Sequence, residues 1–193
     1  MRRVRILDVA RHSFLERGYG GSTMSDIAQS VGGSKATLWS YFPSKEALFA
    51  AVVEQATWQL QADLDSVLQS HLCPRATLEA WSRQLIAALN GPDAISLQRM
   101  IISESARFPQ LGQIFYARGP KRVLEKVAQF LAAEMAAGRL LAVDPQAAAQ
   151  QFIGMIQLPQ MQRLWNLPSV PTIEEAFASA QRAVAAFLRA YAP

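Results

Sequence analysis

Two adjacent glycines, Gly32-Gly33, separate two short segments that each have the pattern of an amphipathic helix. Thr23 can cap the first segment, and Asp26 follows three positions later, where a carboxylate interacts favourably with the amides of a helix start. Glycine tolerates the left-handed backbone that ends a helix abruptly, and Ser34 can cap a second helix directly afterwards. The sequence therefore predicts two short helices joined by a tight turn within residues 23–46.

The second short segment has an apolar side and a polar side. Leu38 and Phe42 are four residues apart, so they share the inward side of a helix. The other side is slim and carries hydrogen-bond donors, as a helix in the major groove of DNA requires; it comprises Lys35, Ala36, Thr37, Ser40 and Tyr41. The alternative is a surface helix of an ordinary helical protein, and composition alone favours that alternative.

A longer pattern changes this preference. The run from Phe14 to Phe49, FLERGYGGSTMSDIAQSVGGSKATLWSYFPSKEALF, resembles the N-terminal domain of the TetR family of bacterial transcriptional regulators. The resemblance implies a helix-turn-helix DNA-binding domain at residues 1–46 and a C-terminal effector-binding and dimerisation domain at 47–193. By position, it also implies DNA contacts from Thr23, Ser25, Lys35, Ala36, Thr37, Trp39, Ser40, Tyr41 and Lys45.

Two residues depart from the family pattern. Gly33 occupies a position where the family usually has an apolar residue, so the turn is expected to pack less tightly. Trp39 replaces the usual tyrosine, so a phenolic hydroxyl that could donate to phosphate becomes an indole N–H. A looser resemblance to one TetR subgroup covers ESARFPQLGQIFYARGPKRVLEKVAQFLAAEMAAGRL and DPQAAAQQFIGM, and it indicates no particular ligand.

Composition and charge are consistent with this interpretation. With 193 residues, 51% of them hydrophobic, the chain can bury a large core. The net charge is +4, and residues 1–50 hold seven Lys or Arg against four Asp or Glu, so most of the excess lies where phosphates would bind. The chain has one cysteine, Cys73, no apolar run of about 20 residues and no apolar signal-peptide core at its start. These features predict a cytoplasmic protein without membrane contact.

The rest of the chain reads as helices throughout. No segment alternates with period two for long enough to be a strand, so we expect an all-α fold of about nine or ten helices. A long helix should run from residue 44 to about 70, and Pro159 should kink a helix between 145 and 164 near 155–159. The remaining helices are expected at about 4–17, 75–90, 92–108, 110–118, 121–137 and 172–190.

The last two long helices carry broad apolar stripes. Pairing with a second copy would make a four-helix interface, the mode of dimerisation that the resemblance implies. The alternative is burial against the rest of the same chain. We favour the homodimer, because symmetry doubles the DNA site, and the predicted interface residues are Ala148, Phe152, Ile156, Pro159, Ile173, Phe177, Ala180, Val184, Phe187 and Leu188.

Aromatic, methionine and polar residues between these helices and the long helix are candidates for an effector pocket. Such apolar residues are more often core, although together they could line a cavity for an unknown small molecule. The candidates are Trp58, Trp81, Met100, Glu104, Phe108, Phe115, Phe130, Gln151 and Met155. Glu104 shares a stripe with Leu97 and Ile101, so it either pairs with Arg99, Arg107 or Arg118 or orients a polar or cationic ligand.

Catalysis has little support in the sequence. The two histidines, His12 and His71, have no metal-ligand spacing nearby, and no phosphate-binding loop or nucleophile elbow is present, so no catalytic residue, metal or cofactor is predicted. We therefore expect a homodimeric repressor that binds a palindromic DNA operator and is released by a small apolar or amphipathic ligand. The alternative is a DNA-binding regulator or architectural protein without an effector.

Overall fold

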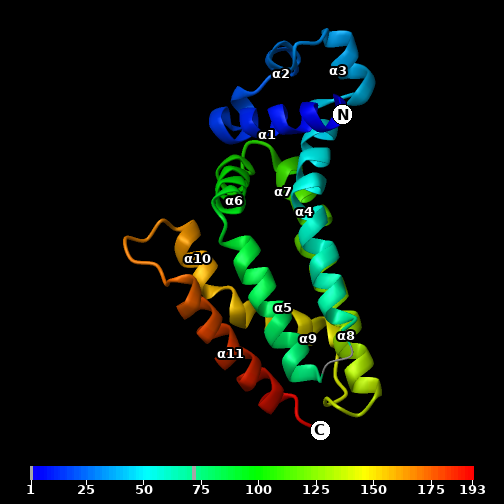
Figure 1. The fold of residues 1–193 in the computed structure, drawn as a ribbon, viewed down its shortest axis with the longest axis vertical. Helices are drawn as coiled ribbons and strands as arrows, with labels where there is room; N and C mark the ends of the chain where they lie inside the picture. Colours follow the sequence, from blue (N-terminus) through cyan, green and yellow to red (C-terminus); the bar gives the residue numbers. More distant parts are fainter. Residues whose placement is uncertain (1, 71–72) are drawn as a thin grey trace. The chain divides into compact units, whose positions relative to one another are not determined.

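The computed structural model describes residues 2–70 and 73–193, which form eleven α-helical segments and no β-strand (Figure 1). The segments are α1 (Arg2–Gly21), α2 (Met24–Val31), α3 (Lys35–Tyr41), α4 (Lys45–Leu68), α5 (Pro74–Leu89), α6 (Pro92–Glu104), α7 (Pro109–Arg118), α8 (Pro120–Ala136), α9 (Pro145–Ile156), α10 (Leu158–Leu164) and α11 (Ile173–Ala190). The predicted all-α class is confirmed. Only Gln157 separates α9 from α10, so they correspond to the single kinked helix that Pro159 predicted.

The predicted capping residues set the helix boundaries. The Thr23 hydroxyl accepts a hydrogen bond from the Asp26 amide at 3.1 Å, and the Ser34 hydroxyl accepts one from the Thr37 amide at 3.1 Å. Gly32 ends α2 in the left-handed conformation, with φ of 74°. The two-helix unit predicted for residues 23–46 is therefore present, and its turn depends on the backbone freedom of glycine.

Two compact units make up the chain. Unit 1 comprises the described residues up to Gln59 together with Ser96–Pro120, and unit 2 comprises Leu60–Ile95 together with Lys121–Pro193. The boundaries fall within α4 and within α6, so both helices run without interruption from one unit into the other. Unit 1 therefore contains more than the predicted 1–46 domain: it also takes in the first part of α4, most of α6 and the whole of α7.

Unit 1 is held together by an aromatic cluster. Phe14 from α1 and Phe49 from α4 have ring centroids 5.6 Å apart, and both rings contact Tyr19. Leu38 and Phe42 are buried in the same core, as their spacing predicts. Helices α1, α2 and α3 thus pack on the beginning of α4, which leaves the opposite side of α3 in solvent.

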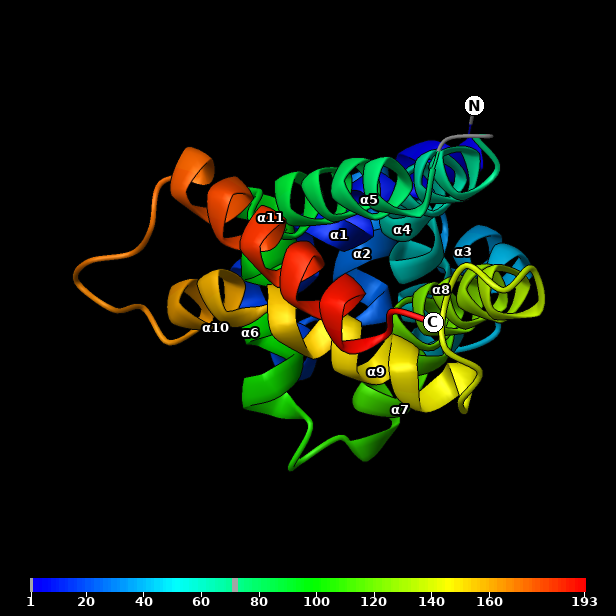
Figure 2. The same cartoon turned by 90° about the horizontal axis from the view of Figure 1, so that it is seen from below.

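Unit 2 has its own core around Trp81. The Trp81 ring lies 5.8 Å from Phe152 of α9, and Phe152 lies 5.1 Å from Phe187 of α11. Helix α11 packs along α5 and α9, as Figure 2 also shows. Within the described ranges, no helix is long and apolar enough to span a membrane.

Seven of the ten residues predicted for the dimer interface are buried within the single chain, and the interface itself stays a prediction. Ala148, Phe152, Ile156, Pro159, Ala180, Val184 and Phe187 are buried in unit 2 itself, so their side chains are not available to a second copy. The alternative, burial against the same chain, applies to them, whereas Ile173, Phe177 and Leu188 are only partly buried. Some large apolar side chains remain exposed at the end of α9, on α10 and just after it, namely Met155, Leu158, Trp165 and Leu167.

Candidate nucleic-acid interface

The polar side of α3 is the most exposed part of the two-helix unit. Trp39 and Tyr41 are 48% and 43% exposed, which is unusual for aromatic side chains in a unit that buries Phe14, Phe42 and Phe49. Lys35, Ala36 and Ser40 are exposed as well, and Thr37 and Ser25 are partly exposed. Aromatic rings and short polar side chains along the exposed side of a short helix can contact base edges and phosphates.

Some of these hydroxyls already have partners. The Ser40 hydroxyl donates to the Thr37 carbonyl at 2.8 Å, and the Thr23 hydroxyl donates to the Asp26 carboxylate at 2.7 Å. Both remain accessible, and a hydroxyl oxygen keeps acceptor capacity when its hydrogen is used. The structure thus brings eight of the nine predicted DNA contacts to the surface of the α2–α3 unit, and Lys45 is the exception.

Lys45 differs from its predicted role. Its ammonium donates hydrogen bonds to the carbonyl oxygens of Tyr19 and Ser22, at 2.7 and 2.9 Å, and lies 4.1 Å from the Tyr19 ring centroid. Burial lowers the pKa of this amine, which the neighbouring carboxylates of Glu46 and Glu104 partly oppose. In this structure Lys45 thus holds the end of α1 with two of its three N–H groups, a role that the resemblance does not imply.

Replacing Lys45 with alanine should therefore lower stability without removing a phosphate contact. We expect the free energy of unfolding of unit 1 to fall by about 1–3 kcal/mol, because two carbonyls lose a charged donor. Operator affinity should fall because the corner before α2 is loosened, whereas the slope of log affinity against log salt should stay the same. A slope smaller by about 0.9, measured by titrations at several salt concentrations, would instead assign Lys45 to a phosphate.

Residues 18–22 form the corner at which Lys45 acts. Gly18 has φ of 73° and ψ of 168°, so α1 loses helical geometry there before α2 begins. The Tyr19 side chain is buried, and its hydroxyl donates to Glu46 at 3.0 Å. Burial, reinforced by the Glu46 carboxylate, raises the pKa of the Tyr19 phenol, so Tyr19 stays protonated.

Glu104, at the end of α6, binds the same corner. Its two carboxylate oxygens accept hydrogen bonds from the backbone amides of Tyr19 and Gly20, at 2.6 and 2.7 Å. Both sequence-based accounts of Glu104, an arginine pair and a ligand contact, are therefore replaced by a contact to backbone 85 residues earlier in the chain. No local pattern indicates this contact, because backbone amides carry no sequence signal.

Two cavities in unit 2 adjoin each other between α4, α5 and α8. One of about 760 Å³ is lined by Asp65, Leu68, Gln69, Ser70, Cys73, Pro74, Thr77, Lys126, Gln129, Phe130, Ala133, Glu134 and Arg139. The other, of about 280 Å³, is lined by Gln61, Leu64, Asp65, Trp81, Arg122, Val123, Glu125, Lys126 and Gln129. Asp65 and Lys126, which line both, form an ion pair at 3.2 Å, so the walls combine charged and apolar groups.

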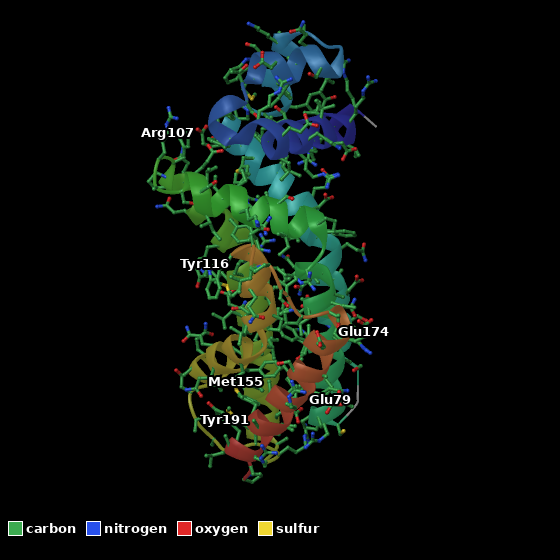
Figure 3. The ribbon with its side chains drawn as sticks, turned by 90° about the vertical axis from the view of Figure 1, so that its left-hand side faces the viewer. Glu79, Arg107, Tyr116, Met155, Glu174 and Tyr191 are labelled. Carbon is green, nitrogen blue, oxygen red and sulfur yellow. The ribbon has the colours of Figure 1, made fainter. Side chains whose placement is uncertain are left out.

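The nine predicted effector residues do not gather at these cavities. Phe130 lines the larger one and Trp81 the smaller one, whereas Trp58 is 65% exposed and Gln151 accepts a hydrogen bond from the Tyr191 hydroxyl. Met100, Glu104, Phe108 and Phe115 belong to unit 1, and exposed Met155 can be found in Figure 3. Helical periodicity cannot separate cavity-lining from core side chains, because both lie on the inward side of a helix.

Metal binding finds no support in the described residues, which contain no cluster of three or more potential ligands. His71, one of the two histidines in the chain, lies outside them.

Two family models match the chain. Residues 6–52 match the bacterial regulatory proteins of the tetR family, and residues 76–193, more than half of the chain, match the C-terminal domain of AefR-like transcriptional repressors. The chain belongs to the TetR family. It is thus a TetR-family transcriptional regulator with a DNA-binding helix-turn-helix, and regulators of this family are not enzymes.

Solved TetR-family structures share the whole fold. A protein from Mesorhizobium loti assigned to the TetR family is 30% identical, with a TM-score of 0.86 over all of this chain and 97% of the other. The flavonoid-responsive regulator FrrA is 34% identical, with a TM-score of 0.85 over 100% and 97% of the two chains. The transcriptional regulator RutR of Escherichia coli is 29% identical over 73% of this chain, which spans 65% of RutR.

Proposed function

We propose that this TetR-family protein is a homodimeric repressor that binds a palindromic operator and is released by a small amphipathic molecule. The DNA-binding part of the proposal rests on the exposed polar and aromatic side of α3. Unit 1 leaves this side in solvent and buries Leu38 and Phe42 on the opposite side. A recognition helix of seven residues reads only a few base pairs, so two copies give a site of useful length.

The cavities between α4, α5 and α8 support the effector part of the proposal. A volume of about 760 Å³ lies within the range of small-molecule sites. Leu68 and Phe130 offer apolar contacts, and Asp65, Lys126 and Arg139 offer charged ones, so the lining suits a ligand with both kinds of group. FrrA is a flavonoid-responsive regulator, and flavonoids are therefore a reasonable first class of compounds to screen.

Selection of duplex DNA from a random library by the purified protein tests the proposal. We expect a palindrome whose two half-sites lie one helical turn apart, and we expect a compound from the screen to release it. Selection of no preferred sequence would contradict the operator. If an operator is selected but no amphipathic compound in the screen releases it, the alternative of a regulator without a small-molecule effector is favoured.

Lys35→Ala and Thr37→Ala should each change which sequence is preferred. Both residues lie in the first turn of α3, where side chains reach base edges, and losing such a contact costs about 1–3 kcal/mol of discrimination. The measurement is affinity for the selected duplex and for its single-base variants. Lys121→Ala is the control: it removes the same charge from an exposed ion pair of unit 2, so the order of preference should not change.

A further inference from the structure

Opposite charges from two different helices hold the corner between α1 and α2. The Glu104 carboxylate takes the amide hydrogens of Tyr19 and Gly20, and the Lys45 ammonium binds the carbonyl oxygens of Tyr19 and Ser22. Successive backbone amides that converge on one carboxylate form an anion-binding nest. In this corner the anion is supplied by the chain itself.

The carboxylate of Glu104 lies so close to Gly18 and Gly20 that a side chain at either position would have little room. A Cβ at Gly18 would lie 2.3 Å from Oε1 of Glu104, and φ of 73° at this position is unfavourable for any side chain. A Cβ at Gly20 would lie 3.2 Å from Oε2 of Glu104 and 3.2 Å from the Phe108 ring. Phe108, the N-cap of α7, also packs against Tyr19, with ring centroids 5.3 Å apart, so the segment from the end of α6 to the start of α7 fits the corner by shape as well as by charge.

The two helices that supply these charges are also those that continue into unit 2. Lys45 is the first residue of α4 and Glu104 is the last residue of α6. Both therefore act on the four residues that precede the cap of α2, and α2 and α3 follow directly. A change in the α6 backbone would reach the recognition unit through this carboxylate, in addition to the core that Leu97, Met100 and Ile101 of α6 share with unit 1.

We propose that Glu104 is a positioning residue for DNA binding, which fixes the corner at Tyr19–Ser22 and couples α6 to the presentation of α2 and α3. The inference rests on the proposed function, because it requires a selected operator. The inference requires no effector. If α6 affects operator affinity through this contact, then operator binding must affect α6 through the same contact, because the coupling between two sites is reciprocal.

The first test compares Glu104→Gln with Glu16→Gln, which removes the same charge from an exposed position of α1. Glutamine has one acceptor oxygen and no charge in place of the two oxygens that the carboxylate offers to the two amides, so we expect about tenfold weaker binding of the selected operator. Binding of an unrelated duplex at low salt should change less than twofold, because the charge and polar side of α3 are intact. Glu16→Gln should bind both duplexes like the natural protein.

The second test measures the coupling by hydrogen exchange. In the natural protein and in Glu16→Gln, the operator should slow amide exchange both in residues 18–23 and in residues 96–104. In Glu104→Gln the operator should no longer slow exchange in 96–104. A residue that only stabilises unit 1 would leave this response in place.

A matched pair of glycine variants tests the same contact from the side of the backbone amides. Gly20→Ala should reproduce the selective loss of operator affinity, because its methyl group displaces Oε2 and Phe108. Gly21→Ala is the control, since a Cβ there meets only the Cβ of Arg17 at an ordinary 3.5 Å. This pair also decides the matter if Glu104→Gln does not fold.

The inference is overturned if Glu104→Gln or Gly20→Ala, folded by circular dichroism, binds the operator as well as the natural protein with the same exchange in 96–104. It is also overturned if affinity for both duplexes falls equally. Failure of the proposed function would be seen earlier, because the natural protein would then select no operator.

Discussion

Replacing Phe49 with alanine is expected to lower the free energy of unfolding of unit 1 by about 3–5 kcal/mol. The Phe49 side chain is fully buried, and its ring makes edge contacts with Phe14 at 5.6 Å and Tyr19 at 5.5 Å. Truncation removes the apolar burial and leaves a cavity between α1 and α4. The measurement is urea unfolding followed by helix content.

Operator binding should be lost together with this stability. Phe49 joins the beginning of α4 to the end of α1, so the cavity lies behind the corner from which α2 and α3 start. Unit 2 has a separate core around Trp81 and should keep its helix content. We therefore expect an unfolding curve with an early transition that includes only part of the helical signal.

Trp58→Ala is the matched control on the same helix. Trp58 is 65% exposed, so its removal should change the unfolding free energy by less than about 0.5 kcal/mol. Equal destabilisation by both changes would show that α4 is stabilised along its whole length, and that the aromatic cluster has no special weight in unit 1.

Features set by neighbours in the chain could be predicted from the sequence. The Thr23 and Ser34 caps and the Gly32 turn depend on residues within four positions, and each has the predicted hydrogen bonds or dihedral angles. The kink at Pro159 follows for the same reason, because proline lacks the amide that an uninterrupted helix needs. The α2–α3 unit was therefore predictable in detail.

Contacts across the sequence were not predictable in this way. Glu104 was placed correctly on the inward stripe of its helix, but its partners are backbone amides of Tyr19 and Gly20. Lys45 was assigned to DNA by resemblance, whereas its ammonium binds carbonyl oxygens of the α1 corner. A charged side chain shows in the sequence that it needs a partner, and only the fold shows which one.

Apolar stripes had a similar ambiguity. Helix α11 has a strong apolar stripe, and most of this stripe is buried against α5 and α9 of the same chain. The large apolar side chains that stay exposed lie elsewhere in unit 2, such as Leu158 at the start of α10 and Trp165 just after it. A surface for a second copy is thus better sought among the exposed residues.

The double variant Leu158→Glu, Trp165→Glu is expected to be monomeric and to bind the operator at least about a hundredfold more weakly. The two side chains are 59% and 60% exposed, among the most exposed large apolar groups described, and two buried carboxylates in each copy would oppose association. A monomer loses the gain of holding two recognition helices together, which is typically 10²–10⁴-fold. Sedimentation and operator titration measure the two effects.

Tyr116→Glu provides the control, since Tyr116 is a large side chain, 52% exposed, that belongs to α7 of unit 1 and not to α10 or the residues just after it. It should leave the oligomeric state unchanged. Because Leu158 and Trp165 contribute little to the core, the double variant should also keep its helix content, so weaker operator binding cannot be attributed to unfolding. A double variant that stays dimeric would move the interface away from α10, and the partly buried Phe177 and Leu188 of α11 would then be the side chains to change.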